Sequence, residues 1–223
     1  MFDSSIVIVI IVLLFSVIFH EVAHGWIAFK LGDPTAKDMG RLTLDPIPHI
    51  DPVMTIIVPI FLYMTMGFAF GGAKPVPVNP YNFKKPKRDM AIVAAAGPVS
   101  NLILAISAIV LYKVLLTFGI LDPMNLSRFY AGDLSIIENL FQFTVIINVV
   151  LMVFNLLPIP PLDGSKILMG FLSHENAIKF ESFSRYGFII IIGIILLGDV
   201  INFSLIGAVI NPVMTFSLNL LYF

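Results

Sequence analysis

Residues 6–29 read IVIVIIVLLFSVIFHEVAHGWIAF, a stretch that is apolar for long enough to cross a bilayer as a single helix. Neither a basic segment nor a small-residue cleavage site accompanies it, so we interpret it as a retained helix and not as a signal peptide. Three polar residues, His20, Glu21 and His24, lie within its last turns. This stretch is therefore predicted to be a membrane-spanning helix that carries ionisable groups.

The composition of the whole chain is also that of a membrane protein. Of its 223 residues, 58% are hydrophobic and 12% are charged, and the mean hydropathy is +0.99. Soluble domains carry about 25% charged residues, so a soluble globular protein, a disordered chain and a coiled coil are excluded. The net charge of -1 leaves no basic domain for nucleic acid. Because the chain has no cysteine, any metal site must be built from His, Asp and Glu.

Further apolar blocks predict an all-α polytopic membrane protein with five to six transmembrane or re-entrant helices. The last block can form two spans, or one span and a shorter helix. The segments at residues 40–44 and 74–78 combine Val, Thr and Leu with Pro and Gly, and predict short β-strands near the cytoplasmic face. No linker is long enough to separate domains, so residues 1–223 are predicted to form a single membrane-embedded domain. The further blocks are residues 52–70, 90–118, 136–157 and 187–223.

The basic residues indicate how the chain is oriented. They gather after residues 6–29, 52–70 and 136–157, and basic loops stay cytoplasmic. The block at residues 52–70 has basic loops on both sides, which a simple crossing would separate across the membrane. We therefore predict that this block, which contains Pro59 and Gly67, enters and leaves the membrane on the cytoplasmic side.

The end of the first apolar block carries the pattern H-E-x-x-H, formed by His20, Glu21 and His24. On a helix, two histidines four residues apart share one face and can bind one zinc ion, while the glutamate can act as a general base. With four His and four Glu in the chain, this pattern arises by chance in roughly one such chain in a thousand. The alternative is a helix end that happens to be polar, but ionisable groups inside a span are costly and indicate function.

A catalytic zinc normally has three protein ligands, so one more must come from elsewhere in the chain. His49 and His174 lie in polar loops, where histidines are more often solvated or capping groups. Asp163 follows the block at residues 136–157, which is predicted to run inward, and therefore lies on the same side of the membrane as the two histidines. Three prolines before Asp163 prevent a continuous helix and force extended backbone. Helix-end chemistry is the alternative for Asp163, and the residues alone leave the two open.

The pairing of H-E-x-x-H with Asn155 and the later Leu-Asp-Gly at 162–164 resembles the site-2 protease family, the intramembrane zinc metalloproteases. The resemblance covers about residues 16–166, with no segment long enough for the PDZ domain of the larger members. It implies one Zn2+ per chain, bound by His20, His24 and Asp163, with Glu21 as the catalytic residue. Further similar stretches are GRLTLDP at 40–46, HIDP at 49–52, GAKPVPVNP at 72–80 and GPVSN at 97–101.

Several roles follow for the residues of such a site. Zinc lowers the pKa of its water toward 7, and Glu21 moves a proton from that water to the leaving amine. Asn155 can donate a hydrogen bond to the oxyanion or to the substrate backbone, although capping the helix before a proline is the alternative. Residues 74–78 are predicted to pair with an unwound substrate as an added strand. Gly97 and Asn101 are predicted to shape helix packing.

The predicted function is an intramembrane zinc endopeptidase that cuts membrane-anchored substrates in or near their transmembrane segments, as in regulated intramembrane proteolysis. Its partners are then a transmembrane protein or peptide and membrane lipid, and the oligomeric state is left open. We expect a multi-pass protein of the plasma membrane with its active site near the cytoplasmic face. The alternatives are a metal-ion transporter or channel, whose polar positions should repeat through several spans, and a catalytically dead scaffold, which would not need an intact set of ligands and base.

Overall fold

The computed structural model describes residues 4–58, 61, 64, 72–121, 123, 135–200 and 204–222. Within these ranges, four helices are long and apolar enough to cross a membrane, and a bent pair of helices provides a fifth candidate. The four are α1 (Ser4–Lys30), α4 (Pro86–Thr117), α6 (Ile136–Asn155) and α10 (Leu205–Tyr222). The bent pair covers His174–Tyr186, which begins with α8 (His174–Ser182), and Ile189–Gly198, which lies within α9 (Gly187–Val200). The predicted all-α polytopic class is confirmed.

The remaining elements are short and lie in the connections between the long helices. They comprise α2 (Thr35–Asp38), 3-10 helices at Ile47–His49, Pro80–Asn82 and Phe183–Tyr186, a π-helical turn at Pro52–Ile57, and α7 (Asp163–Phe171). Of these, α7 packs against α4.

The predicted short β-strands are wrong, since the described part of the chain contains no strand. Residues 72–79 are not in a helix, but Pro75 and Pro77 carry no N–H and cannot complete a strand ladder. Side chains, and not a neighbouring strand, bind the backbone polar groups of this segment. Arg41 Nη2, for example, donates a hydrogen bond to the carbonyl of Lys74 at 2.8 Å. Arg41 reaches this position from residues 40–44, which form no regular element and bend at Leu42 and Thr43.

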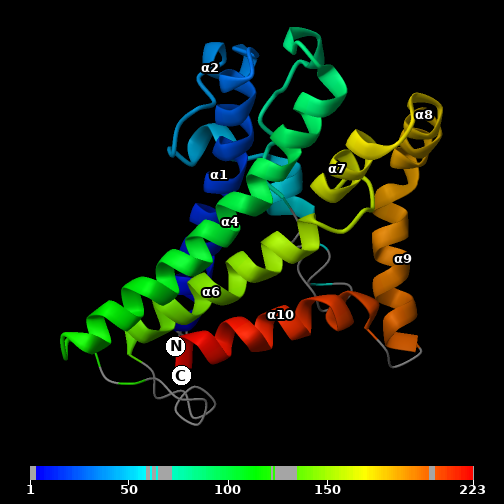
Figure 1. The fold of residues 1–223 in the computed structure, drawn as a ribbon. Helices are drawn as coiled ribbons and strands as arrows, with labels where there is room; N and C mark the ends of the chain where they lie inside the picture. The colour runs from blue at the N-terminus through cyan, green and yellow to red at the C-terminus, as the bar shows by residue number, and fades with distance from the viewer. Residues whose placement is uncertain are drawn as a thin grey trace.

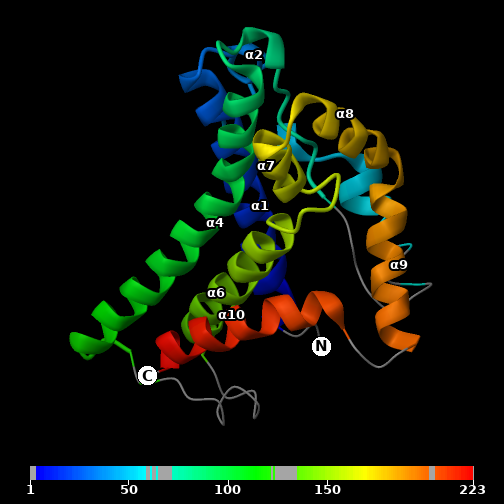
Figure 2. The same ribbon diagram turned by 45° about the vertical axis from the view of Figure 1, so that its right-hand side comes forward.

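The long helices α1, α4 and α6 pack against one another and form the centre of the fold. Figures 1 and 2 show these three leaning together, with α10 lying across the end that is farthest from α2 and α7. In both views α9 stands apart from the three central helices. The apolar core joins α4, α6 and α10, and its buried side chains include Tyr112, Phe141, Val145, Val149 and Leu221.

The segments before and after residues 52–70 meet around Asp33, which is fully buried. Its carboxylate accepts hydrogen bonds from Thr35 Oγ1 at 2.5 Å, from Asn79 N at 2.7 Å and from Asn82 Nδ2 at 2.7 Å. The two segments therefore lie at the same end of the structure. Most of residues 52–70 falls outside the described residues, so the re-entrant path of this block stays a prediction.

Candidate metal centre

Helix α1 presents His20 and His24 from successive turns toward α4, and both imidazoles are buried. His24 Nδ1 lies 2.7 Å from the carbonyl oxygen of Val93. Because a carbonyl can only accept, this nitrogen carries the proton. His20 Nδ1 lies 2.6 Å from Oδ1 of Asn101. This amide oxygen can also only accept, so Nδ1 of His20 carries the proton as well. Both imidazoles therefore direct the lone pair of Nε2 toward a common point.

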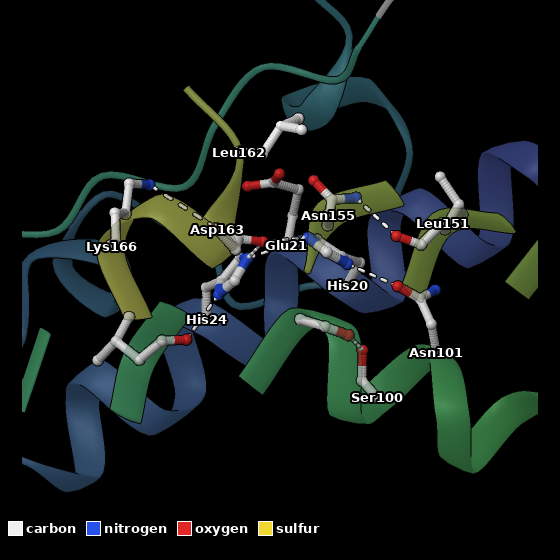
Figure 3. A network of polar contacts seen from close by, with 12 residues as sticks. His20, Glu21, His24, Ser100, Asn101, Leu151, Asn155, Leu162, Asp163 and Lys166 are labelled. Carbon is white, nitrogen blue, oxygen red and sulfur yellow. Dashed lines mark hydrogen bonds and ion pairs between the residues drawn. The ribbon is translucent and has the colours of Figure 1, made fainter. Parts of the chain in front are cut away.

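Asp163 reaches this point from the other side because α7 begins directly against the end of α6. The close approach depends on Gly164, since a Cβ there would lie 2.2 Å from the carbonyl oxygen of Leu156. The Asp-Gly pair thus lets the chain turn after α6 and place a carboxylate in the first turn of α7. Asp163 is buried, and this carboxylate faces the two histidines (Figure 3).

The three donor atoms are spaced as the ligands of one metal ion would be. His20 Nε2 lies 3.0 Å from His24 Nε2, and Asp163 Oδ2 lies 3.1 Å and 3.2 Å from these two nitrogens. Ligands of a tetrahedral zinc with bonds of about 2.0–2.1 Å would be separated by about 3.3 Å. Two lone pairs and a carboxylate oxygen this close together repel one another unless a cation lies between them. The donor set therefore fits zinc.

The charge state of Asp163 also suits a ligand. Without a metal ion, a protonated imidazole can take the place of the cation between the three atoms. Burial raises the pKa of the Asp163 carboxyl group, but hydrogen bonds and charge interactions with His20 and His24 in that protonated form outweigh burial and hold the pKa well below its usual range. The Asp163 carboxylate is consequently ionised at neutral pH, which is the form that binds metal. Lys166 Nζ, 3.8 Å from Oδ1, adds a positive charge on the side away from the histidines.

Glu21 follows His20 on α1 and is held by the backbone of the segment at 72–79. Its Oε2 accepts a hydrogen bond from the Val76 N–H at 2.8 Å. That segment is fixed in turn by the buried Arg41, which donates to the carbonyls of Lys74 and Pro75 at 2.8 Å and 3.4 Å. One carboxylate oxygen of Glu21 is thereby positioned, while the other remains available to a water molecule in the site.

A cavity of about 320 Å³ joins these groups. Its lining combines the histidines, the carboxylates and Lys166 with apolar side chains from the segment at 72–79 and from α4. An unwound peptide could lie in this cavity. Its lining includes His20, Glu21, His24, Pro75, Val76, Val78, Met90, Val93, Ala94, Asn155, Pro161, Asp163 and Lys166.

The other residues considered from the sequence have different surroundings. His49 is buried and not solvated, and its Nε2 lies 2.9 Å from the Thr43 carbonyl oxygen, outside the metal cluster. Asn155 lines the cavity, but its Nδ2 donates to the carbonyl of Leu151 at 2.9 Å, so the local helix-end role is also present. Asn101, expected only to shape helix packing, contacts His20 directly. The sequence did contain one indication that Asn101 belongs to the site, because it lies in the GPVSN stretch, one of the segments that carry the family resemblance.

We expect Gly97→Ala to disrupt the metal centre. A Cβ on Gly97 would lie 2.5 Å from Nε2 of both His20 and His24, at the atoms that would bind the metal. The imidazoles would have to move apart, so metal content and proteolysis should both fall sharply. Gly193→Ala in α9 is the matched control, because a Cβ there meets nothing within 4 Å. Metal analysis of both purified variants checks this, and wild-type metal content in Gly97→Ala would contradict the packing described.

Known proteins give an independent comparison. The model of peptidase family M50 matches residues 8–198. The chain is 40% identical over 181 residues to "Putative zinc metalloprotease YwhC" of Bacillus subtilis, a match that covers 81% of this chain and 76% of that protein. It is 30% identical over 180 residues to "Putative zinc metalloprotease Rip2" of Mycolicibacterium smegmatis, covering 80% of this chain and 62% of that protein. No solved structure matches the chain significantly.

The family match includes both the H-E-x-x-H pattern of α1 and Asp163 of α7. Both relatives carry the name of a zinc metalloprotease, and the cluster of two histidines and a carboxylate can hold a metal ion. The apolar helices are those of a multi-pass membrane protein. The chain therefore belongs to peptidase family M50, the site-2 protease family, and is a zinc metalloprotease of the membrane.

Proposed function

We propose that this metalloprotease is an intramembrane endopeptidase that acts on membrane-anchored substrates, as in regulated intramembrane proteolysis. His20, His24 and Asp163 bind one zinc ion, and Glu21 is the general base. The observation that carries the proposal is the position of the H-E-x-x-H pattern inside α1, a helix apolar enough to span the membrane. A soluble substrate would have little access to a site built there. Residues 1–223 act as one domain in this reaction.

The reaction follows from the chemistry of the site residues. When bound, zinc supplies a Lewis acid that lowers the pKa of a water molecule to about 7. Glu21 accepts a proton from this water and returns it to the amine that leaves when the peptide bond breaks. The Val76 N–H keeps the Glu21 carboxylate in one orientation during both transfers. Asn155 has a second amide hydrogen that can be donated to the developing oxyanion or to the substrate backbone.

The substrate must unwind before it is cut, because the peptide groups of a membrane helix are already hydrogen-bonded to one another. Residues 74–78 belong to no regular element, and Pro75, Val76 and Val78 line the cavity that contains Glu21. We infer that the unwound substrate lies along this segment and pairs only with the backbone groups that Arg41 and Glu21 leave available, since Pro75 and Pro77 have no N–H. Arg41 and Asp33 hold the two ends of the segment, so it is ordered before substrate arrives.

The active site is proposed to open to the cytoplasm, in a protein of the plasma membrane. Basic residues gather at the end of the structure where α1 stops and α4 begins, and basic loops stay cytoplasmic. The contact of 3.4 Å between Asn82 Nδ2 and Thr35 Oγ1 supports a common side for both loops. Membrane lipid then surrounds the apolar faces of the spanning helices.

Cysteine labelling should confirm this orientation, because the wild-type chain has no cysteine to interfere. Met39 and Tyr81 are exposed at the end proposed to be cytoplasmic, and Phe118 is exposed just beyond the opposite end of α4. An impermeant maleimide added to intact cells should label Phe118→Cys and spare Met39→Cys and Tyr81→Cys, which label only after permeabilisation. Labelling of Met39→Cys and Tyr81→Cys from opposite sides would refute the re-entrant path of residues 52–70.

Proteolysis is best tested with purified protein and a panel of tagged single-span helices. Soluble peptides from the same flanking sequences are the controls, and each reaction is run with and without a zinc chelator. We expect cleavage of membrane-anchored substrates only, in or near the spanning segment, and its loss with chelator. The rival function of metal transport predicts zinc uptake into liposomes without cleavage of any substrate in the panel.

A further inference from the structure

A chain of buried polar groups lies behind His20, on the side away from the cavity. Asn101 of α4 and Asn148 of α6 are fully buried, and Ser16 of α1 is 1% exposed. Asn101 Nδ2 donates to Asn148 Oδ1 at 2.8 Å, and Asn148 Nδ2 donates to Ser16 Oγ at 2.9 Å and to the Thr144 carbonyl at 2.9 Å. We call Ser16, Asn101, Thr144 and Asn148 the amide network. It joins the three central helices within their membrane-spanning parts.

The direction of every hydrogen bond in this network is determined from one end. The Thr144 carbonyl can only accept, so Asn148 must turn its NH2 group toward it and its oxygen toward Asn101. Asn101 must then turn its NH2 group toward Asn148 and its oxygen toward His20. An amide oxygen can only accept, and Nδ1 of His20 is therefore the nitrogen that carries the proton. Its Nε2 is left with a lone pair directed at Asp163 and His24.

We propose that the amide network is a positioning device that selects the tautomer of His20 and so presents Nε2 for metal binding. This proposal rests on His20 being a zinc ligand, as proposed above. Hydrogen bonds among Asn101, Asn148 and Ser16 also join the three helices, as polar residues do in membranes, but helix packing alone does not require an acceptor opposite Nδ1 of His20. Only one orientation of the amide places an acceptor 2.6 Å from Nδ1. Mutating a residue that orients a metal-binding histidine in this way typically lowers metal affinity or activity by about 10–100-fold.

The test compares zinc affinity and histidine tautomers in the purified full chain. Zinc affinity is measured by competition with a chromophoric chelator. The tautomers are read from imidazole 15N shifts in metal-free protein, with the His20 signals assigned by their loss in His20→Gln. We expect Asn101→Leu to bind zinc about 10–100-fold more weakly than wild type and to shift His20 toward the tautomer protonated at Nε2. Asn148→Leu should act in the same direction, because Asn101 then loses the partner that orients it.

Two further variants separate positioning from stability. Asn101→Asp keeps an oxygen acceptor opposite Nδ1, and its second oxygen, protonated at this buried position, can donate to Asn148 Oδ1 as the amide did. This variant should restore the zinc affinity and the tautomer that Asn101→Leu loses. Gln142→Met removes another buried amide of α6, which accepts from Tyr222 Oη at 2.8 Å and does not reach His20. This variant should lose stability but keep wild-type zinc affinity and tautomer.

The proposal is overturned if Asn148→Leu and Gln142→Met have the same zinc affinity and the same His20 tautomer. It is also overturned if Asn101→Asp binds zinc as weakly as Asn101→Leu. Failure of the proposed function looks different, because the wild-type protein would then bind zinc but cleave none of the tagged single-span helices. The tautomer of His20 is measured without metal, so the amide network is tested in either case.

Discussion

Glu21→Gln should retain zinc and the native fold but lose proteolysis almost completely. The amide has nearly the shape of the carboxylate, and its oxygen can still accept the hydrogen bond from the Val76 N–H at the same place. It cannot accept a proton from water or return one to the leaving amine. The rate should fall on the order of 10²–10⁴-fold, the range that general acid–base catalysis supplies. The measurement is cleavage of a tagged single-span substrate by purified protein, with zinc content determined on the same samples.

Glu181→Gln is the matched control for this experiment, because Glu181 is an exposed residue near the end of α8. It makes the same chemical change outside the cavity and should cleave at the wild-type rate. If Glu21→Gln also cleaved at a near-normal rate while retaining zinc, Glu21 would not be the general base. The metalloprotease mechanism derived from the site would then be wrong.

Asp163→Asn should lose zinc and, with it, activity. The substitution replaces an anionic ligand by a neutral amide and leaves only the two imidazoles to bind the ion. The side chain of Asp163 is buried between α7 and the histidines, so solvent cannot replace it freely. Zinc affinity should fall by more than about 100-fold, the upper end for partners that only orient a ligand. Competition with a chelator of known affinity measures this difference.

A second buried aspartate provides the control for that variant. Asp33 accepts hydrogen bonds from Thr35, Asn79 and Asn82 and does not belong to the metal cluster. Asp33→Asn should therefore reduce stability and leave the zinc affinity of the folded protein close to wild type. Unchanged zinc affinity in Asp163→Asn would remove Asp163 from the metal site.

The helices that cross the membrane could be predicted from the sequence because their apolar runs are long and local. The run at residues 6–29 corresponds to α1, which spans Ser4–Lys30, and the block at 136–157 corresponds to α6, which spans Ile136–Asn155. The last block, left open as one or two spans, contains both α9 and α10. Its joining to α8 in a bent pair depends on tertiary packing, which periodicity does not report.

The prediction of short β-strands was wrong because the residues at 74–78 have opposing preferences. Residues 74–78 contain two valines, which favour strands, but also Pro75 and Pro77, which remove N–H donors. Hydrogen bonds from Arg41 and to Glu21 took the place of a ladder. These contacts are made between residues far apart in the sequence, so no local pattern revealed them.

The candidate site shows the same division between local and distant contacts. His20, Glu21 and His24 could be found from their spacing, because one helix brings them together. Asp163 lies 143 residues beyond His20, and Asn101 lies 81 residues beyond it. Membrane sidedness and the family resemblance suggested Asp163. Nothing in the spacing of Asn101 indicated that its amide faces His20, and the structure was needed to assign it to the metal centre.

A zinc titration of proteolysis tests the central claim most directly. The protein is stripped of metal by chelation, and cleavage of a tagged single-span substrate is followed as zinc is added back. Our account predicts no cleavage without metal and a rise that ends at one zinc per chain, with Asp163→Asn inactive at that ratio. Cleavage that persists in the stripped protein, or that needs two zinc ions per chain, would contradict it.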